Sequence, residues 1–183
     1  MLSQPLVFVD IETTGLDAIR GRVIEVAAIR VENGADVQEF TSLLDPGMDL
    51  PWHITELTGI TDDDVCGAAT FAQVAAELRA VLDGAVFVAH NVRFDYSFLA
   101  QEFRRLGQTF TPQQLCTVKL SRALYPQQKS HKLENLIHRH SLTYSSRHRA
   151  YDDAAAIWQF MQHVHQNFSP DQIHTALARS LTV

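Results

Sequence analysis

The sequence predicts an α/β domain whose mixed β-sheet is covered by helices on both faces. Three expected strands come first and include a hairpin, and strands alternate with helical segments in the rest of the chain. Antiparallel strands followed by such alternation are typical of a mixed sheet between helical layers. With 183 residues, of which 46% are hydrophobic and 20% charged, the chain is long enough to bury one sizeable core.

The first half of the chain has the signals of an antiparallel sheet. The apolar run at 6–9 predicts a buried strand that leads into Asp10, Glu12 and a turn. Asn33 and Gly34 form a strong hairpin signal between two further apolar segments. The sequence therefore predicts strands at 6–9, 22–31 and 37–44, followed by a loop rich in Pro, Gly and Asp at 45–64.

Helical periodicity dominates the second half, where apolar residues recur every three to four positions. Ser169 is expected to cap a last helix that has Pro170 at its first position. We expect residues 1–166 to form the domain and residues 167–183 to add a C-terminal helix packed on it. The expected helices lie at 71–82, 94–106, 119–125, 132–139, 151–165 and 170–181, and the strands at 86–89 and 115–118.

Composition excludes several classes of protein. No apolar stretch approaches the length of a membrane span, and the first residues lack the basic region of a secretory signal. We therefore expect a cytoplasmic protein that does not bind a membrane. Cys66 and Cys116 lie 50 positions apart, which matches neither a zinc motif nor a disulfide framework.

Charge is divided unevenly along the chain. Residues 1–90 contain four Lys and Arg against fifteen Asp and Glu, a net charge of −11, and residues 91–183 contain eleven against six, a net charge of +5. Much of the positive charge lies within residues 119–149. A basic segment of this kind fits either a phosphate backbone or a solvated surface, and charge alone leaves both interpretations open.

Two carboxylates lie at the end of the first expected strand. Asp10 and Glu12 are two positions apart, so both side chains point to the same face of the sheet. The carboxyl end of a central strand is where open α/β sheets bind ligands. Two carboxylates at this spacing repel each other unless a cation neutralises them.

Two more acidic residues lie on the apolar faces of expected helices. Asp95 shares the apolar stripe of the helix that follows the strand at 86–89, and Asn91 is expected to cap that helix. Asp153 shares the apolar stripe of the long helix, whereas its neighbour Asp152 lies outside this stripe. The helical register therefore selects Asp153 as the inward residue.

Carboxylates drawn to one sheet end from three elements predict a divalent-metal site, because a buried unpaired carboxylate costs several kcal/mol. Ligand sets made of oxygen alone suit Mg²⁺ or Mn²⁺ rather than zinc. His148 lies five residues before Asp153 in a polar segment. With an unperturbed pKa of about 6.5, a histidine beside such a site is suited to act as general base.

Three segments resemble the motifs of the DEDDh 3′→5′ exonucleases. Residues 8–16 (FVDIETTGL) are similar to the first motif, 90–95 (HNVRFD) to the second, and 148–153 (HRAYDD) to the third, whose His-to-Asp spacing of five marks the subgroup. Residues 57–61 (LTGIT) are also similar to a loop of this family. Within it, the motifs resemble those of the proofreading epsilon subunits of bacterial replicative DNA polymerases. The family fold is ribonuclease H-like, a mixed sheet with helices on both faces.

This resemblance implies a hydrolase that removes nucleoside 5′-monophosphates from the 3′ end of DNA with two divalent metal ions, Mg²⁺ or Mn²⁺. His148 would deprotonate the attacking water, and Asp10 would bridge the two ions. The implied metal ligands are Asp10, Glu12, Asp95 and Asp153. The residues implied to contact the substrate or to support its binding are Thr13, Thr14, Gly15, Leu16, His90, Asn91 and Phe94.

The expected partner is a single-stranded or frayed 3′ end of DNA, but two alternatives stay open. An exoribonuclease or oligoribonuclease that trims RNA is one, because a contact to the 2′-OH is a detail of pocket shape. A non-catalytic nucleic-acid-binding or polymerase-accessory module is the other, although an idle site has no reason to hold repelling carboxylates together. The chain ends at Val183, before the polymerase-binding tail of epsilon subunits, so a polymerase partner and stand-alone trimming both stay open.

Overall fold

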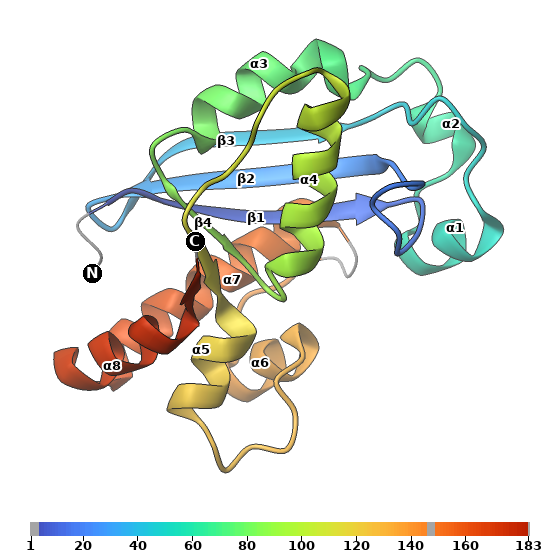
Figure 1. Cartoon of the computed structure of the whole chain (residues 1–183). Helices are drawn as coiled ribbons and strands as arrows, with labels where there is room; N and C mark the ends of the chain where they lie inside the picture. The colour runs from blue at the N-terminus through green and yellow to red at the C-terminus, as the bar shows by residue number, and fades with distance from the viewer. Residues whose placement is uncertain (1–3, 146–148, 183) are drawn as a thin grey trace.

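The predicted mixed sheet is present in the computed structural model, which describes residues 4–145 and 149–182. The strands lie in the order β3-β2-β1-β4-β5-β6 (Figure 1). Because β1 pairs antiparallel with β2 and parallel with β4, it occupies the middle of the sheet. The strands are β1 Leu6–Thr13, β2 Val23–Glu32, β3 Ala35–Leu43, β4 Val86–Ala89, β5 Gln114–Cys116 and β6 Leu181–Thr182.

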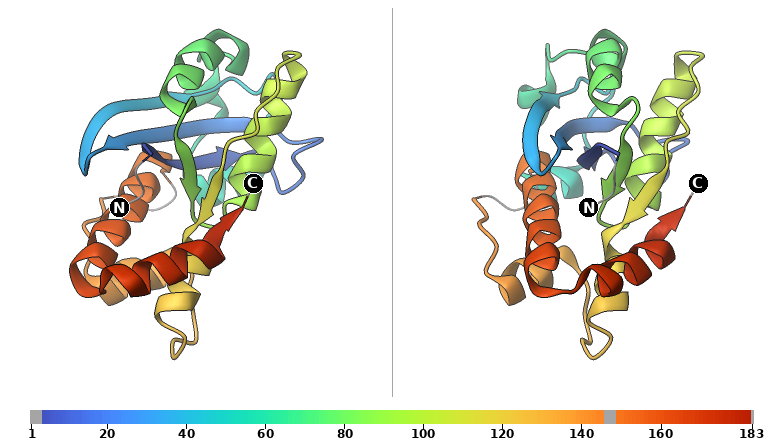
Figure 2. Two further views of the ribbon diagram at one scale, coloured as in Figure 1. Left: turned by 60° about the vertical axis from the view of Figure 1, so that its left-hand side comes forward. Right: turned by 90° about the vertical axis from the view of Figure 1, so that its left-hand side faces the viewer.

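Helices cover both faces of this sheet, which confirms the predicted fold class (Figure 2). One core joins the sheet to α3 and α4, and a second core joins its other face to α5, α6, α7 and α8. The helices are α1 Trp52–Thr58, α2 Asp62–Val65, α3 Phe71–Leu82, α4 Arg93–Arg105, α5 Thr117–Leu124, α6 Leu133–His140, α7 Ala150–Asn167 and α8 Pro170–Ser180.

Alternation along β1 decides which layer each of its side chains meets. Val7 and Val9 lie in the core beneath α3 and α4, whereas Phe8 lies in the core against α7. Successive strand residues point to opposite faces. Asp10 and Glu12 therefore continue the side of Phe8 and face α7 at the end of the strand.

The hairpin predicted from Asn33 and Gly34 joins β2 to β3. Both residues have positive φ, 52° and 82°, as the two central positions of a type I′ turn require. The predicted hairpin is confirmed, and its turn brings β2 and β3 into antiparallel register.

The segment 45–64, predicted as a loop, contains α1 and α2 instead. α1 buries only Ile54 and Thr58, so its sequence has too few apolar positions to show helical periodicity. Gly59 ends α1 with φ 73°, in the left-handed conformation common after helices. Thr61 then opens α2 with a capping box. These two residues were the available signals for the missed helices.

Other boundaries also differ from the prediction. β1, expected at 6–9, continues to Thr13 and includes Asp10 and Glu12. β5 spans Gln114–Cys116 and α5 begins at Thr117, so the strand expected at 115–118 lies slightly earlier. Leu181, expected on the apolar face of the last helix, belongs to β6 and pairs with Leu115. The edge strand β5 offers unpaired backbone N–H and C=O groups. Leu181 bonds to them as a strand residue, which it could not do as one more residue of α8.

The last helix begins as predicted. The Ser169 side chain accepts a hydrogen bond from the Gln172 backbone in a capping box, with Pro170 in the first turn. Ile173, Ala176 and Leu177 of α8 belong to the second core. The division of the chain at residue 166 stays a prediction. Within the described part of the chain, every helix is too short or too polar to cross a bilayer.

Candidate active site

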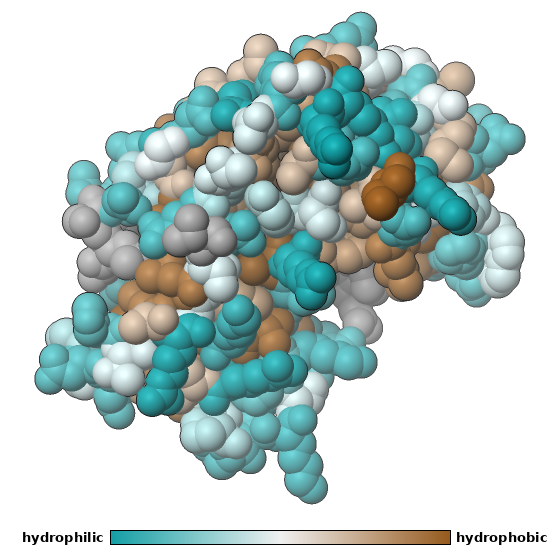
Figure 3. All heavy atoms as spheres, viewed as in Figure 1, coloured by the Kyte–Doolittle hydropathy of each residue, from teal (hydrophilic) through white to brown (hydrophobic). Residues whose placement is uncertain are grey.

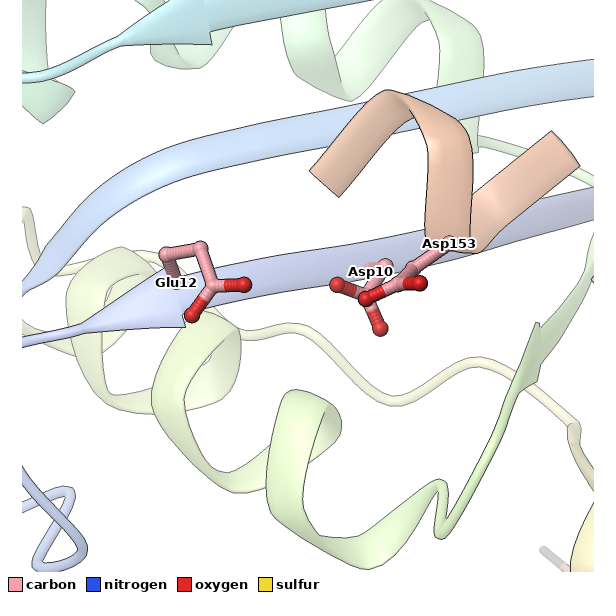
Figure 4. Close-up of side chains that lie close together, drawn as sticks. All are labelled: Asp10, Glu12 and Asp153. Carbon is pink, nitrogen blue, oxygen red and sulfur yellow. The ribbon is translucent and has the colours of Figure 1, made fainter. Parts of the chain in front are cut away.

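Three carboxylates gather where β1 meets the start of α7. Asp10, Glu12 and Asp153 each offer an oxygen atom, and these atoms all lie within 4.8 Å of one another. Figure 4 shows the carboxylates of Asp10 and Asp153 side by side, with that of Glu12 directed toward them along the strand. Residues more than 140 positions apart in the chain thus form one acidic cluster.

The register of α7 turns Asp153 toward the sheet. Ala150, Ala154 and Ile157, on the same side of the helix, are buried in the second core. Tyr144 donates a hydrogen bond from its hydroxyl to Asp153 Oδ1 at 2.7 Å, which fixes the orientation of that carboxylate. The neighbouring Asp152 does not belong to the three-residue cluster.

Asp95 approaches the same site from the opposite layer of the fold. It lies in the first turn of α4 and is only 3% exposed, as its place on the apolar stripe predicts. It does not belong to the cluster of three, but its charge raises the pKa of Asp10 more than that of any other residue does. The structure therefore brings all four predicted carboxylates to one region, with Asp95 outside the tightest group.

Burial and mutual repulsion destabilise the ionised forms of these carboxylates. Desolvation and the charge of Asp153 raise the pKa of Glu12 to about 8, and the nearby Arg149 only partly opposes this. Desolvation also raises the pKa of Asp10 and of Asp95 well above the usual range of aspartate. A raised pKa means that the surroundings of a carboxylate do not neutralise its charge. A bound cation would favour the ionised forms of these groups.

An ion pair between the buried Glu25 and the half-exposed Arg149, which the sequence did not reveal, anchors the start of α7. Glu25 on β2 is 1% exposed and lies directly across the sheet from Glu12. Arg149 donates to Glu25 Oε1 from Nε at 3.0 Å and from Nη2 at 2.8 Å, and the backbone N–H of Ala150 donates to Oε2 at 2.9 Å. This pair holds the first residues of α7, and with them Asp153, against the sheet.

Glu25 and Tyr144 are therefore the site residues that sequence reasoning missed. A single acidic residue inside the apolar segment 23–29 was an available signal for Glu25, because a charge rarely occupies a central strand without a partner. Nothing in the sequence around Tyr144 separates it from an ordinary surface tyrosine. Only the fold brings its hydroxyl to Asp153.

The predicted capping role of Asn91 is wrong. α4 has Val92 at its N-cap position and no side-chain capping bond. Asn91 is exposed, adopts a positive φ of 72°, and its carbonyl accepts a hydrogen bond from the Phe94 backbone at 2.9 Å. Asparagine tolerates this left-handed conformation, so Asn91 turns the chain between β4 and α4 instead of capping the helix.

His90 is held by the protein at both ring nitrogens. Nε2 lies 2.9 Å from the carbonyl oxygen of His131 and therefore donates to it, and Nδ1 lies 3.0 Å from the Thr117 hydroxyl. Burial lowers the pKa of His90 to about 4. The ring thus ties the end of β4 to α5 and to the segment before α6.

Loss of stability below pH 6.5 is the expected consequence of this buried ring. Because the pKa of His90 falls from 6.5 to about 4 on folding, the unfolded chain binds a proton that the folded state resists. This contribution of His90 to stability is fully present above pH 6.5 and is lost as the pH falls toward 4. The total loss is about 3 kcal/mol. Chemical denaturation at several pH values should show the stability advantage of wild type over His90→Gln shrinking in this window.

Because wild type and His90→Gln are compared at each pH, the contributions of all other titrating groups to the free energy of unfolding cancel. These include the carboxylates with raised pKa values, whose contribution changes with pH in the opposite direction. His174→Gln removes an exposed histidine of α8 and serves as the control for loss of a histidine as such. A stability difference between wild type and His90→Gln that stays constant from pH 7.5 to pH 5 would contradict the assignment.

The residues after β1 form a tight turn. The Thr13 hydroxyl donates to the carbonyl of Gly15 at 2.7 Å, and the Thr14 hydroxyl accepts from the Arg22 backbone at 2.9 Å. Both hydroxyls therefore serve the turn itself. Leu16, by contrast, is 90% exposed, and hydrophobic side chains stand out of a mostly hydrophilic surface near the end of β1 (Figure 3).

Phe94 and His148 complete the predicted set. Phe94 is half-buried and packs on Phe98, with ring centroids 5.0 Å apart. His148 lies outside the described residues, and its role stays a prediction.

Comparisons with known proteins agree with this geometry. Residues 7–161 match the model of an exonuclease family, RNase T. The PolC-type DNA polymerase III of Halalkalibacterium halodurans is 39% identical over 168 residues, which cover 88% of this chain and 12% of that protein. The 3′-5′ exonuclease DinG of Bacillus subtilis is 38% identical over 156 residues, which cover 84% of this chain and 17% of that protein. The chain thus spans only a small part of either relative.

A solved structure shares the fold. The zinc-bound complex of Escherichia coli exonuclease I with single-stranded DNA superposes with a TM-score of 0.83 and 20% sequence identity. The match covers 94% of this chain and 42% of that one. At this identity the likeness concerns the ribonuclease H-like architecture of sheet and helices.

Proposed function

The chain belongs to the RNase T exonuclease family, and from this premise we propose that it removes nucleoside 5′-monophosphates from the 3′ end of DNA. The observation that supports the proposal most strongly is the cluster of Asp10, Glu12 and Asp153, with oxygen atoms within 4.8 Å of one another. Selection for stability alone would not gather three repelling carboxylates, because each raises the cost of ionising the others.

The donor set fits divalent cations. It consists of carboxylate oxygens alone, which suits Mg²⁺ or Mn²⁺, and burial leaves these groups poorly neutralised. We assign Asp10, Glu12 and Asp153, with Asp95 close by, as the residues that would hold two such ions. When bound, a metal pair lowers the pKa of water and stabilises the charge that grows on the leaving oxygen.

Protein groups supply the rest of the reaction. His148 accepts the proton of the attacking water, whose oxygen forms a new bond to phosphorus while the bond to the 3′ oxygen of the preceding nucleotide breaks. The products are a nucleoside 5′-monophosphate and a strand shortened by one nucleotide. The Glu25–Arg149 pair keeps the start of α7 in place, so that Asp153 stays aligned with β1.

The terminal nucleotide lies over the turn after β1 in this proposal. A Cβ atom added to Gly15 would meet nothing within 4 Å, so packing within the protein does not demand glycine there, and the space beside its backbone is open to a ligand. The exposed Leu16 is placed to contact the last bases. Phe94, whose ring packs at an angle of 47° to that of Phe98, offers a firm surface beneath the sugar.

DNA is favoured over RNA as the substrate. The relatives are a DNA polymerase and a 3′-5′ exonuclease, and the superposed structure holds single-stranded DNA. A single-stranded or frayed 3′ end is the form in which a terminal phosphodiester can reach the recessed carboxylates. By analogy with the PolC-type relative, we propose a polymerase as the protein partner.

Digestion of 5′-labelled oligonucleotides tests the proposal directly. With Mg²⁺ or Mn²⁺ we expect a ladder that shortens from the 3′ end on single-stranded DNA, and with EDTA we expect no cleavage, because the carboxylates cannot activate water alone. Re-adding Mn²⁺ in excess of EDTA should restore the ladder. Matched RNA tests the exoribonuclease alternative. Binding of DNA without cleavage under any metal condition would support a non-catalytic module instead.

A further inference from the structure

One arginine side chain ties the loop between β1 and β2, residues 14–22, to the end of α4. Arg105 is the last residue of that helix. Its Nη2 atom lies 3.2 Å from the carbonyl oxygen of Ala18, 2.9 Å from that of Ile19 and 3.0 Å from that of Gly21. Three backbone carbonyls of one loop therefore converge on a single nitrogen atom of a residue 84 to 87 positions away in the chain.

A buried carboxylate holds the other terminal nitrogen of Arg105. Glu102, one turn earlier on α4, is 1% exposed, and its Oε1 atom lies 3.1 Å from Arg105 Nη1. Arg22, the last residue of the loop, donates to Oε1 from Nε at 2.8 Å and to Oε2 from Nη2 at 3.2 Å. Glu102 thus joins an arginine of the loop to an arginine of the helix. Buried ion pairs often contribute little to stability, which favours a role of this network in placing the loop.

The loop also packs so closely on α4 that one of its positions has no room for a side chain. A Cβ atom added to Gly21 would lie 2.9 Å from the carbonyl oxygen of Asp17 and 2.9 Å from Cε1 of Phe98 on α4. The backbone N–H of Gly21 donates to the same Asp17 carbonyl at 2.7 Å, so the loop cannot widen here without losing a hydrogen bond. Packing and charge therefore hold the loop in the same place.

The side chains that this loop presents to solvent are apolar. Leu16 is 90% exposed and Ile19 is 75% exposed, and the loop that carries them lies beyond the tip of β1 (Figure 1). Burial does not fix such exposed side chains, so their positions depend on the backbone of the loop. A ligand binds an ordered loop more tightly than a mobile one, because the entropy of ordering is already lost.

We propose that Arg105 is a positioning residue for the 3′ end of the substrate. It holds the loop so that the turn at Gly15 and the side chain of Leu16 meet the terminal nucleotide in a preset place. The inference rests on the proposed function, which assigns that nucleotide to this turn. Because Arg105 acts on the loop and not on the acidic cluster, it should affect binding of the strand and leave the chemical step unchanged.

A comparison of Arg105→Ala with Arg104→Ala tests the proposal. Both remove a positive charge from the last turn of α4, where a cation favours the helix dipole, but in the described part of the chain only Arg105 bonds to the loop carbonyls. On 5′-labelled single-stranded DNA, Arg105→Ala should raise KM about tenfold and leave kcat within about twofold, because the nucleotide must then order the loop. Arg104→Ala should change neither. Arg105→Lys, which keeps the charge without the planar fork, should give an intermediate KM.

Hydrogen exchange of the protein without DNA provides a readout that does not depend on activity. The backbone amides of residues 14–22 should exchange faster in Arg105→Ala than in wild type, since fewer contacts then oppose local opening. Exchange in α7 and calorimetric Mn²⁺ binding should stay unchanged, because the acidic cluster keeps its geometry. Gly21→Ala, which forces the loop away from α4 without changing a charge, should reproduce both the faster exchange and the higher KM.

Two results would overturn the proposal. Faster exchange of the loop with an unchanged KM would show that Arg105 only stabilises the fold. Exchange and KM equal to those of Arg104→Ala would show that Arg105 does not order the loop at all. Failure of wild type itself to shorten the strand is a separate result, because it refutes the proposed function and this role with it. If Gly21→Ala lowers the melting temperature strongly, the two arginine variants still decide.

Discussion

Asp153→Asn will lower the rate of DNA hydrolysis about 10³-fold, whereas Asp152→Asn will leave it within a few-fold of wild type. The two residues are neighbours on α7, but only Asp153 contributes to the cluster with Asp10 and Glu12. An amide cannot supply the negative charge that a divalent cation needs, and loss of one electrostatic group at a reacting centre typically costs 10²–10³-fold or more. The comparison isolates position, because both substitutions remove the same charge from the same helix.

Single-turnover rates on a 5′-labelled single strand, measured over a range of Mn²⁺ concentrations, provide the readout. Asp153→Asn should also weaken the dependence of rate on Mn²⁺, and Asp152→Asn should retain it. Melting temperatures of both variants exclude a general loss of folding. The reverse order of effects, with Asp152→Asn the inactive protein, would refute the assignment of Asp153 to the site.

His148→Ala will slow turnover by about 10²–10⁴-fold, the usual contribution of a positioned acid–base group. The expectation rests on the resemblance of residues 148–153 to the third motif, and on the anchoring of the next residue, Arg149, to Glu25. The loss should fall on kcat, since a general base acts on the bound water. Thr or Ser at this position would not replace the function.

The pH profile separates a base from a merely structural histidine. In wild type, the rate should rise with pH through the titration of one group, and in His148→Ala this limb should disappear. His174→Ala, on the exposed side of α8, is the matched control and should retain both rate and profile. Near-wild-type activity of His148→Ala on single-stranded DNA would remove His148 from its proposed role.

Local signals in the sequence were enough for most of the fold. The hairpin at Asn33 and Gly34, the start of α8 at Ser169, and the apolar stripes of α4 and α7 follow from backbone preferences and periodicity within a few residues. The same periodicity placed Asp10 and Glu12 on one face of β1 and selected Asp153 over Asp152. The short α1 and α2 escaped because they bury few side chains.

Other features depended on partners far away in the chain. Glu25 meets Arg149 across 124 positions, and Asp153 meets Tyr144 through a turn that no periodicity describes. β6 forms because its residues meet the open edge of β5. Sequence patterns report which side of an element faces the core, because that depends on spacing along one segment. Which charges then meet, and how deeply they are buried, depends on distances in space, which only the tertiary structure decides.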